Sequence, residues 1–225
     1  MGIVEDGARP GVMALKIAVG DRPLTVLCLG AHSDDIEIGA GATILTLAER
    51  FESIMVHWIV LSAHDERAAE ATHGAELFAP GAEVHIHEFP DARFPMHLDP
   101  LKDVFVELGR LVQPDLIFTH SAHDFHQDHG VVNRLTWQTF RDHLILEYEV
   151  PKFDGDLRTP NFYYEVEAEI ADAKVRYLET AFKSQTAKPW FDQAAFLGLM
   201  RIRGIECRSS SGLAEGFHVR KATIV

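Results

Sequence analysis

The stretch that decides the fold is Leu24-Thr-Val-Leu-Cys-Leu-Gly-Ala-His32-Ser-Asp34-Asp35-Ile-Glu-Ile-Gly39. It opens with six apolar or weakly polar residues that Gly30 ends. A run without polar alternation is typical of a strand buried on both faces of a parallel sheet. His32, Asp34 and Asp35 follow at once, so we expect them at the carboxyl end of that strand, where open parallel sheets bind ligands.

Strands and helices alternate along the chain outward from this stretch. The hydrophobic pattern predicts further strands at Val56–Leu61, Val84–Phe89 and Leu116–Thr119, and helices at Thr43–Phe51, Asp65–Phe78, Leu101–Val112 and 129–142. This ordering favours an α/β fold with a parallel sheet and right-handed crossovers.

The remaining segments complete a single domain over residues 1–225, a length that suits one substantial core. Residues 143–165 contain two prolines and a glycine and are expected to form an irregular loop that contacts substrate. Residues 1–22 are expected to form a loose arm. We also expect a short strand at Leu15–Val19, helices at Ala168–Ser184 and Phe191–Ile205, and an edge strand at Gly216–Val225.

The charge balance restricts the partners. The chain has 21 basic and 34 acidic residues and a net charge of −13. An acidic surface repels phosphates, so nucleic acid and anionic membranes are not expected partners, and a small substrate is. The sequence has two cysteines, no secretory signal and no run long enough to span a membrane, so we expect a cytoplasmic protein.

A second polar cluster follows the fourth predicted strand and contains His120, His123, Asp124, His126, Asp128 and His129. The two clusters meet if the first and fourth strands are neighbours in the sheet. A catalytic zinc site needs three protein ligands and an open fourth position. The clusters supply histidines and carboxylates for such a site, with one carboxylate left over as a base for the water that zinc activates.

Simpler explanations exist for both clusters. Asp34 and Asp35 precede a predicted helix and could cap it. The four histidines of the second cluster lie three residues apart, so one helix could present them as a stripe that scavenges metal, although Phe125 and the abrupt strand end favour a loop. Spacing alone leaves these alternatives open.

Both clusters resemble motifs of a known family. Residues 32–39, His-Ser-Asp-Asp-Ile-Glu-Ile-Gly, resemble the His-Pro-Asp-Asp-x-Glu-x-Gly signature of the PIG-L/LmbE-like N-deacetylases. Residues 126–129, His-Gln-Asp-His, resemble that family's His-x-Asp-His motif, and the resemblance covers roughly residues 22–205. It implies a Rossmann-like, mostly parallel sheet flanked by helices and one catalytic Zn²⁺ per chain. Ser33 stands where the family has proline, a change that keeps every ligand.

The resemblance also implies roles for individual residues. The zinc ligands would be His32, Asp35 and His129. Asp34 would be the general base, and His126 would stabilise the tetrahedral oxyanion or protonate the leaving amine. Asp128 would orient His126.

Other matched or neighbouring residues allow two interpretations. Arg67, which Glu70 follows at a helical spacing, would grip sugar hydroxyls; the alternative is an ordinary exposed salt bridge. Glu37 is expected to support the loop. Asp91, Arg93 and Asp124 lie near strand ends, where they could touch substrate or serve as structural polar residues.

The function implied by the resemblance is hydrolysis of the N-acetyl group of an amino sugar, an N-acetylglucosamine-type glycoside or conjugate, by a homo-oligomer, either a trimer or a hexamer. One alternative is an amidase that acts on another N-acyl or thiol conjugate. Another is a non-catalytic metal-binding or nucleotide-binding module. Gly39-Ala-Gly41 falls short of a dinucleotide fingerprint, and the adjacent carboxylates would repel a pyrophosphate.

Overall fold

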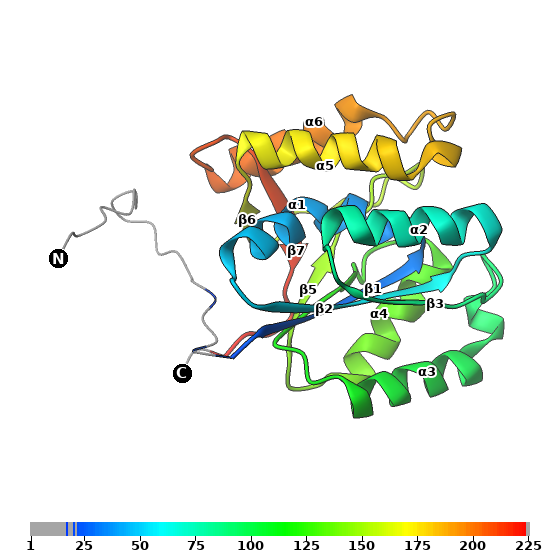
Figure 1. The fold of residues 1–225 in the computed structure, drawn as a ribbon. Coiled ribbons are helices and arrows are strands. Elements are labelled where there is room, and N and C mark those ends of the chain that lie inside the picture. The colour runs from blue at the N-terminus through cyan, green and yellow to red at the C-terminus, as the bar shows by residue number, and fades with distance from the viewer. Residues whose placement is uncertain (1–16, 18–19, 21, 224–225) are drawn as a thin grey trace.

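The computed structural model describes residues 17, 20 and 22–223. A seven-stranded sheet of order β3-β2-β1-β4-β5-β7-β6 lies between helical layers (Figure 1). The elements in chain order are β1 (Leu24–His32), α1 (Asp35–Arg50), β2 (Ile54–Ser62), α2 (Asp65–Phe78), β3 (Glu83–Ile86), η1 (Phe94–Met96), α3 (Leu98–Leu111), β4 (Leu116–His120), α4 (Gln127–Thr139), β5 (Leu144–Tyr148), β6 (Phe162–Glu165), α5 (Ala168–Ala181), η2 (Lys183–Gln185), α6 (Gln193–Cys207) and β7 (Ala214–His218).

The predicted α/β fold with a mostly parallel sheet is confirmed, and β1 is the middle one of the parallel strands β3-β2-β1-β4-β5. β1 pairs in parallel with β2 on one side and with β4 on the other. Its side chains alternate between two cores: Val26 and Cys28 join one apolar cluster, and Leu27 and Leu29 join the other. The carboxyl ends of β1 and β4 are therefore side by side, as the meeting of the two polar clusters requires.

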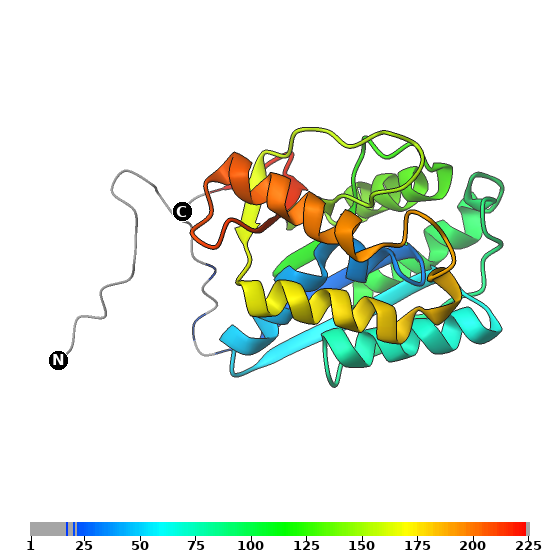
Figure 2. The same ribbon diagram turned by 90° about the horizontal axis from the view of Figure 1, so that it is seen from above.

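The helices cover both faces of the sheet. α1, α2, α5 and α6 lie on one face, and α3 and α4 lie on the other (Figure 1). From above, α5 and α6 run side by side as the outermost elements of the first face (Figure 2). None of the described helices is both long and apolar enough to cross a membrane.

The helix predicted at Thr43–Phe51 begins earlier, at Asp35. The stretch rich in glycine and alanine before Thr43 is thus helical, and its glycines are required for packing. A Cβ on Gly39 would lie 2.6 Å from Tyr148 Cγ, and one on Gly41 would lie 3.0 Å from Phe78 Cδ1. These glycines let the helix approach neighbouring rings, which is a different purpose from cradling a phosphate.

The prediction of an irregular segment over 143–165 is wrong at both ends. Residues 144–148 form β5, and residues 162–165 form β6. The prolines and the glycine that suggested a loop all lie between these strands, at Pro151, Gly155 and Pro160. Only the connection 149–161 is irregular, and its contact with substrate stays a prediction.

The predicted edge strand Gly216–Val225 is also corrected. β7 ends at His218 and lies inside the sheet, antiparallel to both β5 and β6, so that β6 forms the edge. Strand order depends on long-range pairing, which a local pattern does not contain. The predicted strand at Leu15–Val19 and most of the arm 1–22 lie outside the described residues.

Candidate active site

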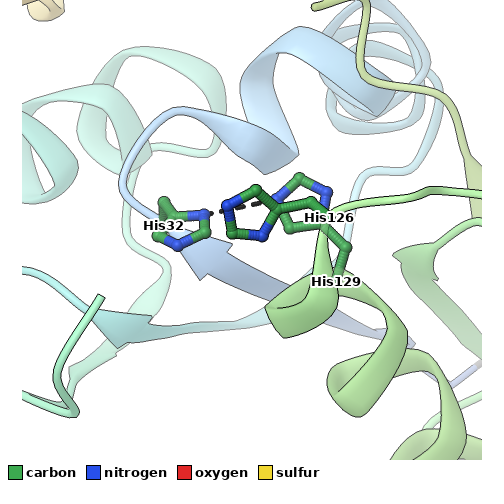
Figure 3. A group of neighbouring side chains, drawn as sticks. All are labelled: His32, His126 and His129. Carbon is green, nitrogen blue, oxygen red and sulfur yellow. Dashed lines mark hydrogen bonds between the residues drawn. The ribbon is translucent and has the colours of Figure 1, made fainter. Parts of the chain in front are cut away.

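The two polar clusters meet at the carboxyl edge of the sheet. His32 ends β1, Asp34 occupies the N-cap position of α1, and Asp35 is the first residue of that helix. His126 is the N-cap residue of α4, and His129 follows in its first turn. The rings of His32, His126 and His129 face one another (Figure 3). The four histidines of the second cluster lie on a strand, a loop and a helix, so they do not form a helical stripe.

Donor atoms of three residues lie close together at this edge. His32 Nδ1 lies 3.2 Å from His129 Nε2 and 3.3 Å from an oxygen of Asp35. The other Asp35 oxygen lies 3.5 Å from His129 Nε2. Ligands held at ~2.0–2.1 Å from a tetrahedral ion are about 3.3–3.4 Å apart. The donor types suit zinc, and the pairwise distances are close to this spacing, with a different Asp35 oxygen nearest to each histidine.

The imidazole of His129 is supported from behind. Its Nδ1 lies 2.8 Å from Asp124 Oδ2, and Lys152 Nζ lies 2.9 Å from that same oxygen. A carboxylate on Nδ1 fixes the tautomer that leaves the Nε2 lone pair free for a metal. Burial, together with the charge of nearby His120, lowers the pKa of His129 to about 4. His129 is thus a neutral imidazole at physiological pH.

His120 lies close to the same donors but is already engaged. Its ring stacks on His129 with centroids 3.8 Å apart, and its Nε2 lies 3.3 Å from Asp35 Oδ2. The backbone N–H of Ala31 donates to that Nε2 at 2.9 Å. Because this hydrogen bond uses the Nε2 lone pair, His120 is the weaker candidate for a ligand, and it packs behind the site instead.

Asp34 does not cap α1 with its side chain. Its Oδ1 accepts a hydrogen bond from Arg67 Nη2 at 2.8 Å, whereas its Oδ2 is buried and has no partner among the described residues. Burial raises the pKa of Asp34, and the charge of Arg67 opposes that rise. Arg67 also pairs with Glu70 at 2.7 Å, so the expected helix salt bridge exists alongside a contact with the site.

His126 and Asp128 are placed differently from one another. The backbone N–H of Asp128 donates to His126 Nδ1 at 3.3 Å. The Asp128 carboxylate accepts from the backbone N–H groups of Ala92 and Phe94, and one oxygen lies 3.5 Å from His32 Nε2. The contacts of this carboxylate thus favour orientation of His32 over orientation of His126.

The other candidates lie around this centre. Asp91 is exposed and its Oδ1 lies 3.0 Å from His32 Nε2, and Arg93 is exposed in the same loop. Glu37 is fully buried under the loop, and its carboxylate has no hydrogen-bond partner among the described residues. Burial raises the pKa of Glu37 well above its usual value.

Sequence reasoning did not foresee the support of His129 by Asp124 and Lys152. The separation of Asp124 and His129 by five residues, across a helix start, was an available signal for the first of these. Lys152 comes from the connection after β5, and nothing in its local sequence indicates a contact with Asp124.

The sequence is similar to known deacetylases. The family model described as PIG-L, GlcNAc-PI de-N-acetylase, matches residues 27–140. The chain is 26% identical over 139 residues to the uncharacterized deacetylase YaiS of Escherichia coli K12, which covers 56% of this chain and 74% of that protein.

Two solved structures share the fold. One is the N,N'-diacetylchitobiose deacetylase from Pyrococcus horikoshii, with a TM-score of 0.66, 15% identity, and coverage of 87% of this chain and 83% of that one. The other is GalB, the 4-carboxy-2-hydroxymuconate hydratase from Pseudomonas putida KT2440, with a TM-score of 0.68, 18% identity, and coverage of 90% and 98%. At these identities the likeness concerns the fold.

Proposed function

This chain belongs to the PIG-L, GlcNAc-PI de-N-acetylase family of amide-hydrolysing deacetylases, and from that premise we propose that it removes the N-acetyl group of an amino sugar with the help of one zinc ion. The observation that carries the proposal is the set of donor atoms on His32, Asp35 and His129, which lie 3.2–3.5 Å from one another. The carboxylate of the neighbouring Asp34 has one oxygen without a hydrogen-bond partner among the described residues. Three ligands and a neighbouring base are the parts of a hydrolytic zinc site.

The residues divide the chemistry among them. Zinc, when bound, polarises the amide carbonyl and makes water acidic enough to attack near neutral pH. Asp34 accepts the proton of the attacking water at Oδ2, since its Oδ1 is held by Arg67. The water oxygen bonds to the carbonyl carbon, the C–N bond breaks, and acetate and a free amine leave.

His126 serves the other side of the reaction. Its Nδ1 accepts the backbone N–H of Asp128, so the neutral ring carries its proton on Nε2 and can donate a hydrogen bond to the carbonyl oxygen, while the proton that Asp34 takes from the water passes to the departing nitrogen. Oxygens of Asp91 and Asp128 lie 3.0 Å and 3.5 Å from the far nitrogen of His32, and Asp124 contacts that of His129 at 2.8 Å. The sugar contact that the resemblance implies for Arg67 stays a prediction.

The alternatives have less support. A hydratase shares the fold, so the fold alone does not fix the reaction, and the family membership favours amide hydrolysis. A nucleotide-binding module is disfavoured because Gly39 and Gly41 lie inside α1, against Tyr148 and Phe78. Hydrolysis of another N-acyl conjugate uses the same residues and differs only in the amine.

The test combines metal analysis with a substrate panel. We expect about one zinc per chain, and acetate release from N,N'-diacetylchitobiose or another N-acetylglucosamine glycoside that a chelator abolishes and added zinc restores. N-acetylated amino acids provide the comparison substrates. Zinc occupancy without acetate release from any amide would contradict the proposal and favour the binding module.

Two variants test the assignment of roles. Asp34→Asn should keep zinc and lose about 10²–10⁴-fold in kcat because only the base is removed. His129→Ala should lose zinc itself, as measured by metal content after gel filtration. Loss of zinc from Asp34→Asn would mean that Asp34 is the ligand and Asp35 the base. Full zinc occupancy in His129→Ala would mean that His120 or His126 is the ligand instead.

A further inference from the structure

A chain of hydrogen bonds runs from Asp34 to the turn that follows α5. Arg67 Nη2 donates to Asp34 Oδ1 at 2.8 Å, and Arg67 Nη1 donates to Glu70 Oε2 at 2.7 Å. Ser184, in η2, donates to Glu70 twice: its backbone N–H to Oε1 and its hydroxyl to Oε2, both at 2.7 Å. Asp34 at the start of α1 and Ser184 in η2, which are far apart in sequence, are thus linked through Arg67 and Glu70.

The chain lies largely out of solvent. The side chains of Asp34 and Glu70 are 7% and 9% exposed, and that of Arg67 is 26% exposed. The Arg67 guanidinium also lies over the ring of Phe182, 5.7 Å from its centroid. A planar fork with both nitrogens bonded and one face covered has little freedom to rotate.

These bonds keep the guanidinium in place. Rotation away from either partner would leave one of two buried carboxylates without its cation, and an uncompensated buried charge is strongly destabilising. The contacts therefore give Arg67 a role toward the protein, alongside any contact that its remaining N–H groups make.

The role follows from the asymmetry of Asp34. One oxygen of this carboxylate is fixed by Arg67, and the other is buried without a partner among the described residues. A carboxylate pinned at one oxygen cannot rotate to exchange the two. The same oxygen then faces the attacking water in every turnover.

We propose that Arg67, held by Glu70 and Ser184, is a positioning residue that fixes the orientation of the base Asp34. The inference rests on the proposed deacetylase function, and it assigns to Arg67 the orientation of the base. Ser184 holds Arg67 through Glu70 and also directly, since Arg67 Nη1 lies 3.4 Å from its hydroxyl, so the turn after α5 supports the base.

Steady-state kinetics separate the two roles of Arg67. With the zinc-loaded enzyme and N,N'-diacetylchitobiose, Arg67→Met should lower kcat about 100-fold, because a misplacement of about 1 Å has that effect. Glu70→Gln and Ser184→Ala should lower kcat by smaller factors in that order, and KM should stay within about twofold. A raised KM at unchanged kcat would overturn the proposal and assign Arg67 to the substrate.

Matched variants near Ser184 control for damage to the turn. Thr186 is exposed two residues further on, and its hydroxyl bonds only locally, to Lys183 O at 2.9 Å. Thr186→Ala should leave kcat unchanged. Ser184→Thr keeps the hydroxyl and should recover most of the activity that Ser184→Ala loses; failure of this rescue would contradict the relay.

A second measurement needs no substrate. In a double-mutant cycle on the full chain, the change in unfolding constant for Asp34→Asn combined with Ser184→Ala should differ by about twofold or more from the product of the two single changes. Independent effects would show that the relay does not reach Asp34. If the wild-type chain releases no acetate, the proposed function fails, and this cycle still decides the relay.

Discussion

Glu70 is a buried carboxylate that its neighbours keep charged. Burial alone would raise the pKa of its carboxyl group, but the hydrogen bonds from Ser184 and Arg67 outweigh that effect and leave the pKa below its usual value. A depressed folded-state pKa contributes stability that is present above the unfolded pKa and is lost as pH falls through the folded pKa.

The pH dependence of stability should therefore change in Glu70→Gln. In the metal-free protein we expect the wild-type free energy of unfolding to fall more steeply than that of the variant below about pH 4.3, the ordinary pKa of Glu. Chemical denaturation at a series of pH values between neutral and acid measures both slopes. Parallel curves through the acid range would mean that Glu70 gains nothing from Ser184 and Arg67.

At the residue scale, the sequence predicted which motif residues lie together, but it did not predict which residues form hydrogen bonds or ion pairs with them. Its two clusters placed His32, Asp34, Asp35 and His129 together, as the geometry has them. Lys152 was not foreseen, because its contact with Asp124 joins segments that are adjacent only after folding. A hydrogen bond between distant segments has no local signature.

Among the elements, α1 illustrates how a helix is set by what it packs against. The proposed base is its N-cap residue and one proposed ligand is its first residue, and Gly39 brings the helix against the ring of Tyr148. Tyr148 in turn donates to Leu29 O at 2.8 Å, which ties β5 to β1 beneath the site. The close approach of α1 therefore fixes the height of Asp34 and Asp35 above the sheet.

Gly39→Ala should destabilise the protein by about 2–3 kcal/mol, since overpacking beside Tyr148 exceeds the gain in helix propensity. Gly198 provides the matched control, because it also lies inside a helix and an added Cβ there would meet no atom within 4 Å. Gly198→Ala should be neutral or stabilising by up to about 1 kcal/mol. Urea denaturation measures both; equal effects would remove the packing argument.

The elements that the sequence missed share one cause. β5 and β6 flank a connection rich in turn-forming residues, and those residues dominated the pattern over 143–165. The strands and helices before residue 142 were found, apart from the early start of α1, because apolar runs and turn residues separate them clearly. The place of β7 in the sheet depends on partners that its own five residues do not specify.

For the molecule as a whole, a buried ion pair joins the outer helical layer to the sheet. Lys174 on α5 lies 2.6 Å from Glu215 on β7, and both side chains are 3% exposed. Glu215 also accepts from the backbone N–H groups of Ala42 and Thr43 in α1, and Lys174 donates to Ile38 O. Three elements are thereby fastened at one point behind the site.

Lys174→Met should lower the free energy of unfolding by about 3–5 kcal/mol, because it leaves the charge of Glu215 buried without a cation. Lys188 is exposed and rests over Trp190, so Lys188→Met should change stability by less than about 1 kcal/mol. Chemical denaturation compares the two. A loss below 1 kcal/mol for Lys174→Met would show that solvent or a neighbouring group compensates Glu215.

The insertion of β7 between β5 and β6 also sets an order of events during synthesis. The strands around the proposed metal centre emerge from the ribosome early and pair with one another as they appear. β6 has no strand to pair with until α5 and α6 have been made and β7 arrives to join it to β5. A nascent chain therefore contains the strands around the proposed metal centre before it contains β7. During that interval β5 has an unpaired edge, which is the surface most exposed to misassembly.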